Sequence, residues 1–326
     1  MVDVVKTVSG FPSAGRYTAD GDPAVISVKT WSGDEPPKGI LQLNHGMQEY
    51  IDRYDEFARI AVTHRWRVVG MDFIGHGDSV ETDDQLAFTG VKLAGGRNPF
   101  LEDVHTLRVQ TQRDWPGLPY FMLGHSMGSF VLRAYLREHG QGLQGAIISG
   151  TSAMGKPLIW FGKSLLGTLD LFYPPTHRST LFESMSVGAY ETAFRRPGEK
   201  ATGFEWLSRD PVEVGKYIED YRCGMVFTMA ANHLLMDVVS KANAGSTYAS
   251  THKDLPILIV SGKSDPVGAM AVGVRKVADS YRRAGITDLT VNLYPEARHE
   301  LFHETNRIEV YTDILTWMDE RIPEHQ

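Results

Sequence analysis

The sequence has little cysteine and no surplus of basic residues. Of 326 residues only one, Cys223, is a cysteine, so no disulfide can form within the chain, and a reducing compartment is favoured. Lysine and arginine number 33 against 40 aspartates and glutamates, which gives a formal net charge of −7. Because no basic block stands out, nucleic acid is not expected as a partner.

Long apolar runs are missing as well. No 18 consecutive residues are apolar, so no membrane-spanning helix is predicted. Residues 1–6 lack the basic segment and apolar run that begin a secretory signal, and we therefore expect a cytoplasmic protein. With 42% hydrophobic and 22% charged residues, the composition is that of a globular protein, long enough for one large domain or a core domain with an insertion.

Short β-branched runs alternate with segments of helical period along much of the chain. This alternation predicts a mostly parallel central sheet flanked by helices. The predicted strands are Ala24–Trp31, Gly39–Leu43, Trp66–Phe73, Tyr120–Leu123, Gln144–Ser149, Pro256–Ser261 and Leu289–Tyr294. The predicted helices are Tyr54–His64, Phe100–Arg113, Gly128–His139 and a closing helix over about 305–320.

The alternation stops between residues 153 and 252. We predict a mainly helical cap there, inserted between two parts of one core, 1–152 and 253–326. An apolar stripe with helical spacing begins the cap, and it consists of Leu158, Phe161, Leu165, Leu169 and Phe172. Our main interpretation is that this stripe packs onto the core; the alternative is an apolar lip that touches lipid aggregates or a membrane surface.

A nucleophilic serine is predicted at Ser126. The segment 124–128, Gly-His-Ser-Met-Gly, is the one G-x-S-x-G pattern in the chain. An apolar strand runs directly into it and an amphipathic helix leaves it, as in a tight strand-to-helix turn that exposes the serine Oγ. The flanking glycines are needed because side chains there would clash with the neighbouring strand and helix.

A serine hydroxyl needs a base to take its proton, and the base needs an acid to orient it. Asp265 and His299 each follow the end of a predicted strand, in the order Ser…Asp…His. Since functional groups on open α/β sheets gather at the carboxyl ends of strands, we predict His299 as general base and Asp265 as its partner. Asp237 is a weaker alternative acid, because it lies inside the predicted cap.

The oxyanion of acyl transfer needs two donors. We predict the backbone N–H of Met127, directly after the nucleophile, and the N–H of Met47, in the loop after the early strand. His45 precedes this loop, and we interpret it as a support of the loop rather than as a base.

Five motifs in this order resemble the α/β-hydrolase superfamily, and within it the monoacylglycerol lipase and lysophospholipase-like group. They are His45-Gly46, residues 72–79 (Asp-Phe-Ile-Gly-His-Gly-Asp-Ser), residues 124–128, Asp265-Pro266 and Arg298-His299-Glu300. The resemblance implies the α/β-hydrolase fold with a cap over the site, no cofactor, and hydrolysis of acyl esters with a glycerol-like head group. One departure is Gln48-Glu49-Tyr50, where the family often has a second histidine, so head-group preference stays open.

Other functions compete with a serine esterase. A peptidase or an acyltransferase would use the same triad, and a non-catalytic binding protein would keep only the fold. Residues 299–303 match the zinc motif H-E-x-x-H, but the motif follows a strand and a proline, and no third ligand stands at a familiar spacing; we predict no metal. Two Gly-Lys-Ser fragments lack the upstream glycine of a phosphate loop. Cys223 is interpreted as a buried small residue, and the resemblance implies that a cap cysteine can lie near the substrate channel.

Overall fold

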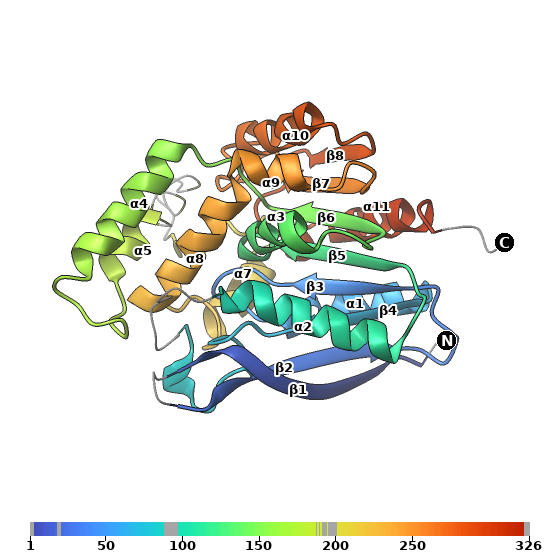
Figure 1. Ribbon diagram of the computed structural model, residues 1–326, viewed down its shortest axis with the longest axis horizontal. Helices are drawn as coiled ribbons and strands as arrows, with labels where there is room; N and C mark the ends of the chain where they lie inside the picture. Colours follow the sequence, from blue (N-terminus) through green and yellow to red (C-terminus); the bar gives the residue numbers. More distant parts are fainter. Residues whose placement is uncertain are drawn as a thin grey trace.

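The computed structural model describes residues 3–17, 21–87, 97–186, 188, 190, 194 and 201–322. These residues form one eight-stranded sheet in the order β1-β2-β4-β3-β5-β6-β7-β8 (Figure 1). Strand β2 runs antiparallel to β1 and β4, and the pairs from β4 to β8 are parallel, which confirms the predicted mostly parallel sheet. The strands are β1 Val5–Arg16, β2 Pro23–Ser32, β3 Gly39–Asn44, β4 Trp66–Met71, β5 Tyr120–His125, β6 Gly145–Ser149, β7 Ile257–Gly262 and β8 Leu289–Tyr294.

Helices cover both faces of the sheet because the central strands are apolar on both sides. In β5, Tyr120 and Met122 join the core beneath α2, α3 and α10, whereas Phe121 and Leu123 join the core beneath α1 and α11. The alternation is the two-residue period of a strand. These helices are α1 Asp55–Thr63, α2 Pro99–Asp114, α3 Met127–His139, α10 Val272–Ala284 and α11 Arg307–Asp319.

The segment between β6 and β7 carries a separate group of helices. Figure 1 shows α4, α5 and α8 at the left, beyond the carboxyl ends of the parallel strands. Among the described residues of 153–252 there is no strand, only an isolated bridge between Arg178 and Thr228. The division into core and cap stays a prediction. The helices are α4 Lys156–Leu169, α5 Thr180–Ser186, α7 Pro211–Glu219, α8 Met229–Ala242 and α9 Gly245–Ser250.

The expected packing of the apolar stripe on α4 is wrong for most of its members. Leu158, Phe161 and Phe172 are 60%, 48% and 73% exposed. Of the predicted stripe only Leu169 is buried, and it shares the buried face of α4 with Ile159 and Leu166, which are not part of the stripe. Because α4 is apolar on more than one side, the spacing of its apolar residues alone does not indicate which side faces inward.

Two elements of the core were not predicted. Strand β1 is an edge strand with mostly exposed side chains, and it contains Gly10 and Pro12, which a strand tolerates best at an edge. Helix α10 begins with Val272-Gly273-Val274, and valine and glycine are weak helix formers. Within the part of the chain that the structure describes, no helix is both long and apolar enough to cross a membrane.

Arg133 connects α3, the helix after Ser126, to the segment between β6 and β7. Its side chain is fully buried and donates to the carbonyls of Ser152 and Ala242, both at 2.9 Å, and to the hydroxyl of Tyr248 at 2.5 Å. No carboxylate among the described residues pairs with it. Neutral acceptors alone therefore hold a buried guanidinium, and each would lose its donor if the side chain were removed.

We predict that Arg133→Met lowers the free energy of unfolding by about 3 kcal/mol or more, because buried acceptors lose their donor. Urea denaturation measures the change. The control is Arg113→Met on α2, whose exposed guanidinium pairs with Asp114 at 3.2 Å and should change stability by less than about 0.5 kcal/mol. Equal effects of the two substitutions would contradict the prediction.

Candidate functional site

Ser126 lies at the tight turn between β5 and α3. Its backbone has φ 51° and ψ −116°, in a region that L-residues rarely adopt. A Cβ on Gly124 would lie 2.2 Å from the carbonyl oxygen of Gly128, and a Cβ on Gly128 would lie 2.1 Å from that of Asn44. Both glycines are therefore required for the close approach of strand and helix, as the sequence pattern predicted.

The structure brings the three predicted side chains together. The Nε2 of His299 lies 2.9 Å from the Oγ of Ser126, and its Nδ1 lies 3.0 Å from the Oδ2 of Asp265. The Oδ1 of Asp265 accepts from the N–H of Val267 at 2.9 Å. His299 and Asp265 are both buried. In the neutral imidazole, Nδ1–H donates to the carboxylate and Nε2 accepts from the serine hydroxyl, which is the arrangement that makes a serine nucleophilic.

The loops that carry Asp265 and His299 are joined directly to each other. The N–H of Ser264 donates to the carbonyl of Ala297 at 3.0 Å. A Cβ on Gly262 would lie only 2.1 Å from the same carbonyl oxygen, so a glycine at the end of β7 lets the loops meet. The acid and the base are thereby positioned as one unit.

Met47 and Met127 place two backbone donors beside Ser126. Met127 is the first residue of α3, and neither its N–H nor that of Met47 donates to any group among the described residues. The loop of Met47 passes close to the serine, since a Cβ on Gly46 would lie 3.2 Å from the Cβ of Ser126. Two free N–H groups at a helix N-terminus and a facing loop can bind an oxyanion.

Two buried side chains support the loop that contains Met47. The Nε2 of His45 accepts from the N–H of Phe73 at 3.0 Å, and its Nδ1–H donates to the carbonyl of Gly46 at 2.7 Å. His45 thus contacts the loop and not Ser126, in agreement with a supporting role. The Oε1 of Glu49 accepts from the N–H of Gly46 at 2.5 Å. Gly46 is held at both of its backbone polar groups.

A buried ion network beneath the site was not predicted. Arg53 donates to both carboxylate oxygens of Glu300, at 2.6 and 2.8 Å, and to Glu49 at 2.8 Å. Burial opposes the charge of Glu300, but the bidentate guanidinium outweighs it and lowers the pKa of Glu300 to about 2. For Glu49 burial is the larger effect: it raises the pKa of this carboxyl, although the Arg53 guanidinium acts to lower it. Arg53 therefore links the Met47 loop to the residue directly after His299.

An apolar cavity of about 330 Å³ opens at Ser126. Residues from the β3 loop, α3, α4, α5 and α8 line it, and most of them are aliphatic, aromatic or methionine side chains. The lining includes Met47, Met127, Phe130, Leu158, Ile159, Phe161, Leu165, Phe182, Tyr190, Trp206, Met236, Val239 and Val267. Cys223 is not among them; it is buried, and burial raises the pKa of its thiol to about 12.

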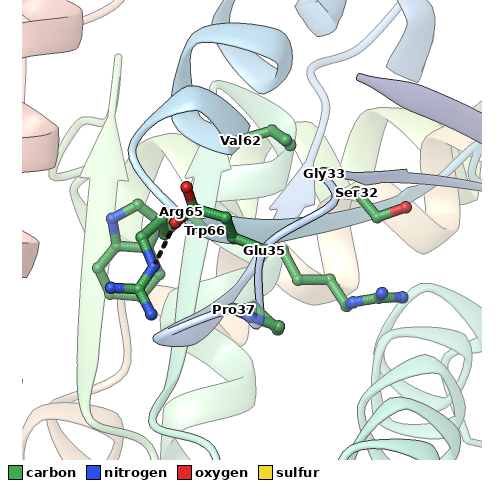
Figure 2. A pocket seen from close by; sticks show the side chains of 8 residues that line it. Ser32, Gly33, Glu35, Pro37, Val62, Arg65 and Trp66 are labelled. Carbon is green, nitrogen blue, oxygen red and sulfur yellow. Dashed lines mark ion pairs between the residues drawn. The ribbon is translucent and has the colours of Figure 1, made fainter. Parts of the chain in front are cut away.

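A second hollow lies at the other end of the sheet, where β4 begins. Figure 2 shows Glu35, Val62, Arg65 and Trp66 around it, with the ion pair between Arg65 and Glu35 at 3.2 Å. Its volume of about 10 Å³ has room for roughly one water molecule. It is too small for a substrate.

The residues of the zinc motif are not arranged as metal ligands, and the alternative acid, Asp237, does not pair with His299. Residues 299–303 run through a turn into the short 3₁₀ helix η3 (Leu301–His303), not along one α-helix, and the Nε2 of His303 contacts the carbonyl of Arg53. Among the described residues, no three His, Cys, Asp or Glu side chains are grouped to hold a metal. Asp237 pairs with Lys241 at 2.9 Å on α8 and is not the partner of His299.

The sheet order, the strained serine turn and the histidine and aspartate at later strand ends define an α/β-hydrolase. The fold is similar to a carboxyl esterase from Bacillus coagulans solved with glycerol, with a TM-score of 0.82 and 24% identity over 98% of this chain and 99% of the esterase. Residues 35–306 match the family described as serine aminopeptidase S33, and the chain belongs to this family of α/β-hydrolases.

Its curated relatives include lipases. The monoacylglycerol lipase of Mycolicibacterium smegmatis is 26% identical over 303 residues, which cover 90% of this chain and 92% of the lipase. The human monoglyceride lipase is 25% identical over 310 residues, covering 94% and 90% of the two chains. The predicted resemblance to the monoacylglycerol lipase group is thereby confirmed at the level of the family.

We predict that kcat/KM decreases as the pH is lowered, with an apparent pKa above 6.5. Burial opposes a charge on His299, but the Asp265 carboxylate outweighs it, so the pKa of His299 is raised above its ordinary 6.5. Only the neutral imidazole can accept the proton, and activity is therefore lost as the pH falls through this raised pKa. A pH profile of kcat/KM on a soluble ester measures this apparent pKa. An acid limb centred at or below 6.5 would contradict the assignment.

Proposed function

We propose that this protein is a serine carboxylic-ester hydrolase that cleaves acylglycerol-like esters with medium to long acyl chains. The observation that carries the proposal is the hydrogen-bonded series from Ser126 through His299 to Asp265, which opens into an apolar cavity. The machinery is suited to acyl transfer, and the lining is suited to an acyl tail.

In the proposed reaction, the Oγ of Ser126 attacks the ester carbonyl while the Nε2 of His299 takes its proton. The Asp265 carboxylate stabilises the imidazolium, and the N–H groups of Met47 and Met127 stabilise the oxyanion. The tetrahedral intermediate collapses to an acyl-enzyme, and the leaving alcohol takes the proton from His299. Water then attacks the acyl-enzyme with His299 again as base, which releases the fatty acid and frees Ser126.

The cavity favours an ester over a peptide substrate. An aminopeptidase must recognise a charged α-amino group, for which a carboxylate is the usual partner. None of the described residues that line the cavity is an aspartate or a glutamate. The names of the curated relatives also indicate acylglycerols. A transferase would use the same acyl-enzyme with an alcohol in place of water, so product analysis separates it from a hydrolase.

We expect hydrolysis of p-nitrophenyl esters and monoacylglycerols, with kcat/KM rising with acyl length until the cavity is filled. Ser126→Ala should lower kcat by about 10⁴–10⁶-fold, because it removes the nucleophile. A fluorophosphonate should label the wild type and not this variant. Ser280→Ala is the matched control. The Ser280 hydroxyl, on α10, bonds to the Lys276 carbonyl at 2.8 Å and has no contact with Ser126. Release of amines but no fatty acid would favour a peptidase, and an unlabelled wild type would indicate a binding protein.

We also propose that the end of α4 touches lipid aggregates. Leu171 and Phe172, in the turn after α4, are 79% and 73% exposed, and the next residue, Tyr173, is 43% exposed. Large apolar side chains exposed together mark surfaces that bind another apolar phase. They directly follow α4, whose residues Leu158, Phe161 and Leu165 line the cavity, so a docked lipid surface would contact the same segment of the chain that encloses the acyl tail.

The double variant Leu171→Ser/Phe172→Ser should reduce binding to phosphatidylcholine vesicles at least about tenfold. The reason is that the two apolar side chains, which would move from water into the lipid on binding, are replaced by polar ones. Its kcat/KM on soluble p-nitrophenyl butyrate should stay within about twofold of wild type. Val109→Ser is the control, since this exposed residue of α2 lies outside α4. Vesicle binding that does not change in a co-sedimentation assay would remove the proposed lipid contact.

A further inference from the structure

Gln48 adopts an unusual backbone in the loop beside Ser126. Its φ is +60°, in the left-handed region that favours glycine, although it carries a full side chain. It stands between Met47, whose N–H is the proposed oxyanion donor, and Glu49, whose carboxylate accepts from the N–H of Gly46. A residue in this conformation persists only where its surroundings determine it strongly.

Two contacts from the inserted segment hold Gln48. Its side-chain Nε2 donates to the Oε1 of Glu183 on α5 at 2.5 Å. Its carbonyl accepts from the N–H of Gly224, after α7, at 3.1 Å. Gln48 is 5% exposed, and its hydrogen bond to Glu183 is partly shielded from water. The residue next to the candidate oxyanion donor is thus bonded on both sides to the segment between β6 and β7.

A third contact lies two residues further along the loop. The hydroxyl of Tyr50 donates to the Oδ2 of Asp220 at 2.5 Å and accepts from Arg222 at 2.5 Å. The guanidinium of Arg222 also lies 4.0 Å from the centre of the Tyr50 ring. The loop therefore depends on the inserted segment for much of its support, and Gln48 contributes the contact closest to Met47.

We propose that Gln48 is a positioning residue that connects helix α5, through Glu183, to the orientation of the Met47 N–H. The inference rests on the proposed function, because it assigns this N–H to the oxyanion. When α5 is in place, the side-chain hydrogen bond holds Gln48 left-handed and the Met47 N–H directed at the site. The inserted segment then contributes to transition-state stabilisation and not only to substrate binding.

The kinetic test compares Glu183→Ala, Glu183→Gln, Gln48→Gly and the double variant Gln48→Gly/Glu183→Ala. We expect Glu183→Ala and Gln48→Gly each to lower kcat about ten- to a hundredfold with KM within twofold, since removal of an oxyanion donor itself costs about 10²–10³. The double variant should lose no more than either single variant. Glu183→Gln keeps an acceptor oxygen and should retain most activity.

Gln48→Gly separates the effect of the side-chain hydrogen bond from that of the backbone conformation. It removes the side chain, but glycine still adopts the left-handed conformation without strain. If this variant keeps full kcat, the side-chain contact is not needed and the proposal is overturned. Affinity for a trifluoromethyl ketone, which forms an oxyanion on the serine, should fall by the same factor as kcat. A loss confined to KM, or additive losses in the double variant, would also overturn it.

Hydrogen exchange of residues 44–50, followed by mass spectrometry, tests the contact without any substrate. Exchange should be faster in Glu183→Ala than in wild type, and unchanged in the control Glu219→Ala, an exposed glutamate of α7. Equal exchange in wild type and Glu183→Ala would overturn the proposal. A wild type that hydrolyses no ester would instead overturn the proposed function, and the exchange comparison would still decide whether α5 holds the loop.

Discussion

The backbone of Ser126 is the constraint on which the site depends. A left-handed non-glycine residue costs about 1–3 kcal/mol, so it must be held by its surroundings. Here the helix after it packs against the end of β3 so closely that Gly128 has no room for a Cβ. The same turn directs Oγ at His299 and leaves the N–H of Met127 free at the start of α3. One local conformation thus sets the position of the hydroxyl and of one proposed oxyanion donor.

Local patterns in the sequence predicted the central sheet and the three side chains at its carboxyl edge. The predicted strands are short runs rich in β-branched and apolar residues, and Ser126, Asp265 and His299 each follow such a run. The contacts that join distant segments could not be predicted in this way. Arg53 and Glu300 are 247 positions apart, and no spacing rule connects them. The sequence also could not predict which side of α4 is buried, because a helix that is apolar on several sides has no unique buried face.

The departure of residues 48–50 from the family pattern has a structural counterpart. Where the family often has a second histidine, this chain has Gln48-Glu49-Tyr50, and Gln48 and Tyr50 bond to the segment between β6 and β7. Glu49 turns inward to Gly46 and Arg53. The polar atoms of these three residues are therefore engaged in holding the loop. A head group that relies on a free imidazole at this place would find none here among the described residues.

Because the loops of Asp265 and His299 are joined to each other, these two residues would stay paired if the site were disrupted. Both side chains belong to the β7–β8 half of the sheet, whereas Ser126 belongs to β5, and β6 separates the two halves. A fluctuation that parts β6 from β7 would carry the hydroxyl away but leave the acid and base still paired. If Ser126 and His299 have the proposed roles, such an opening would separate the nucleophile from the base, while the Asp265 carboxylate would keep the imidazole in the tautomer that the reaction needs.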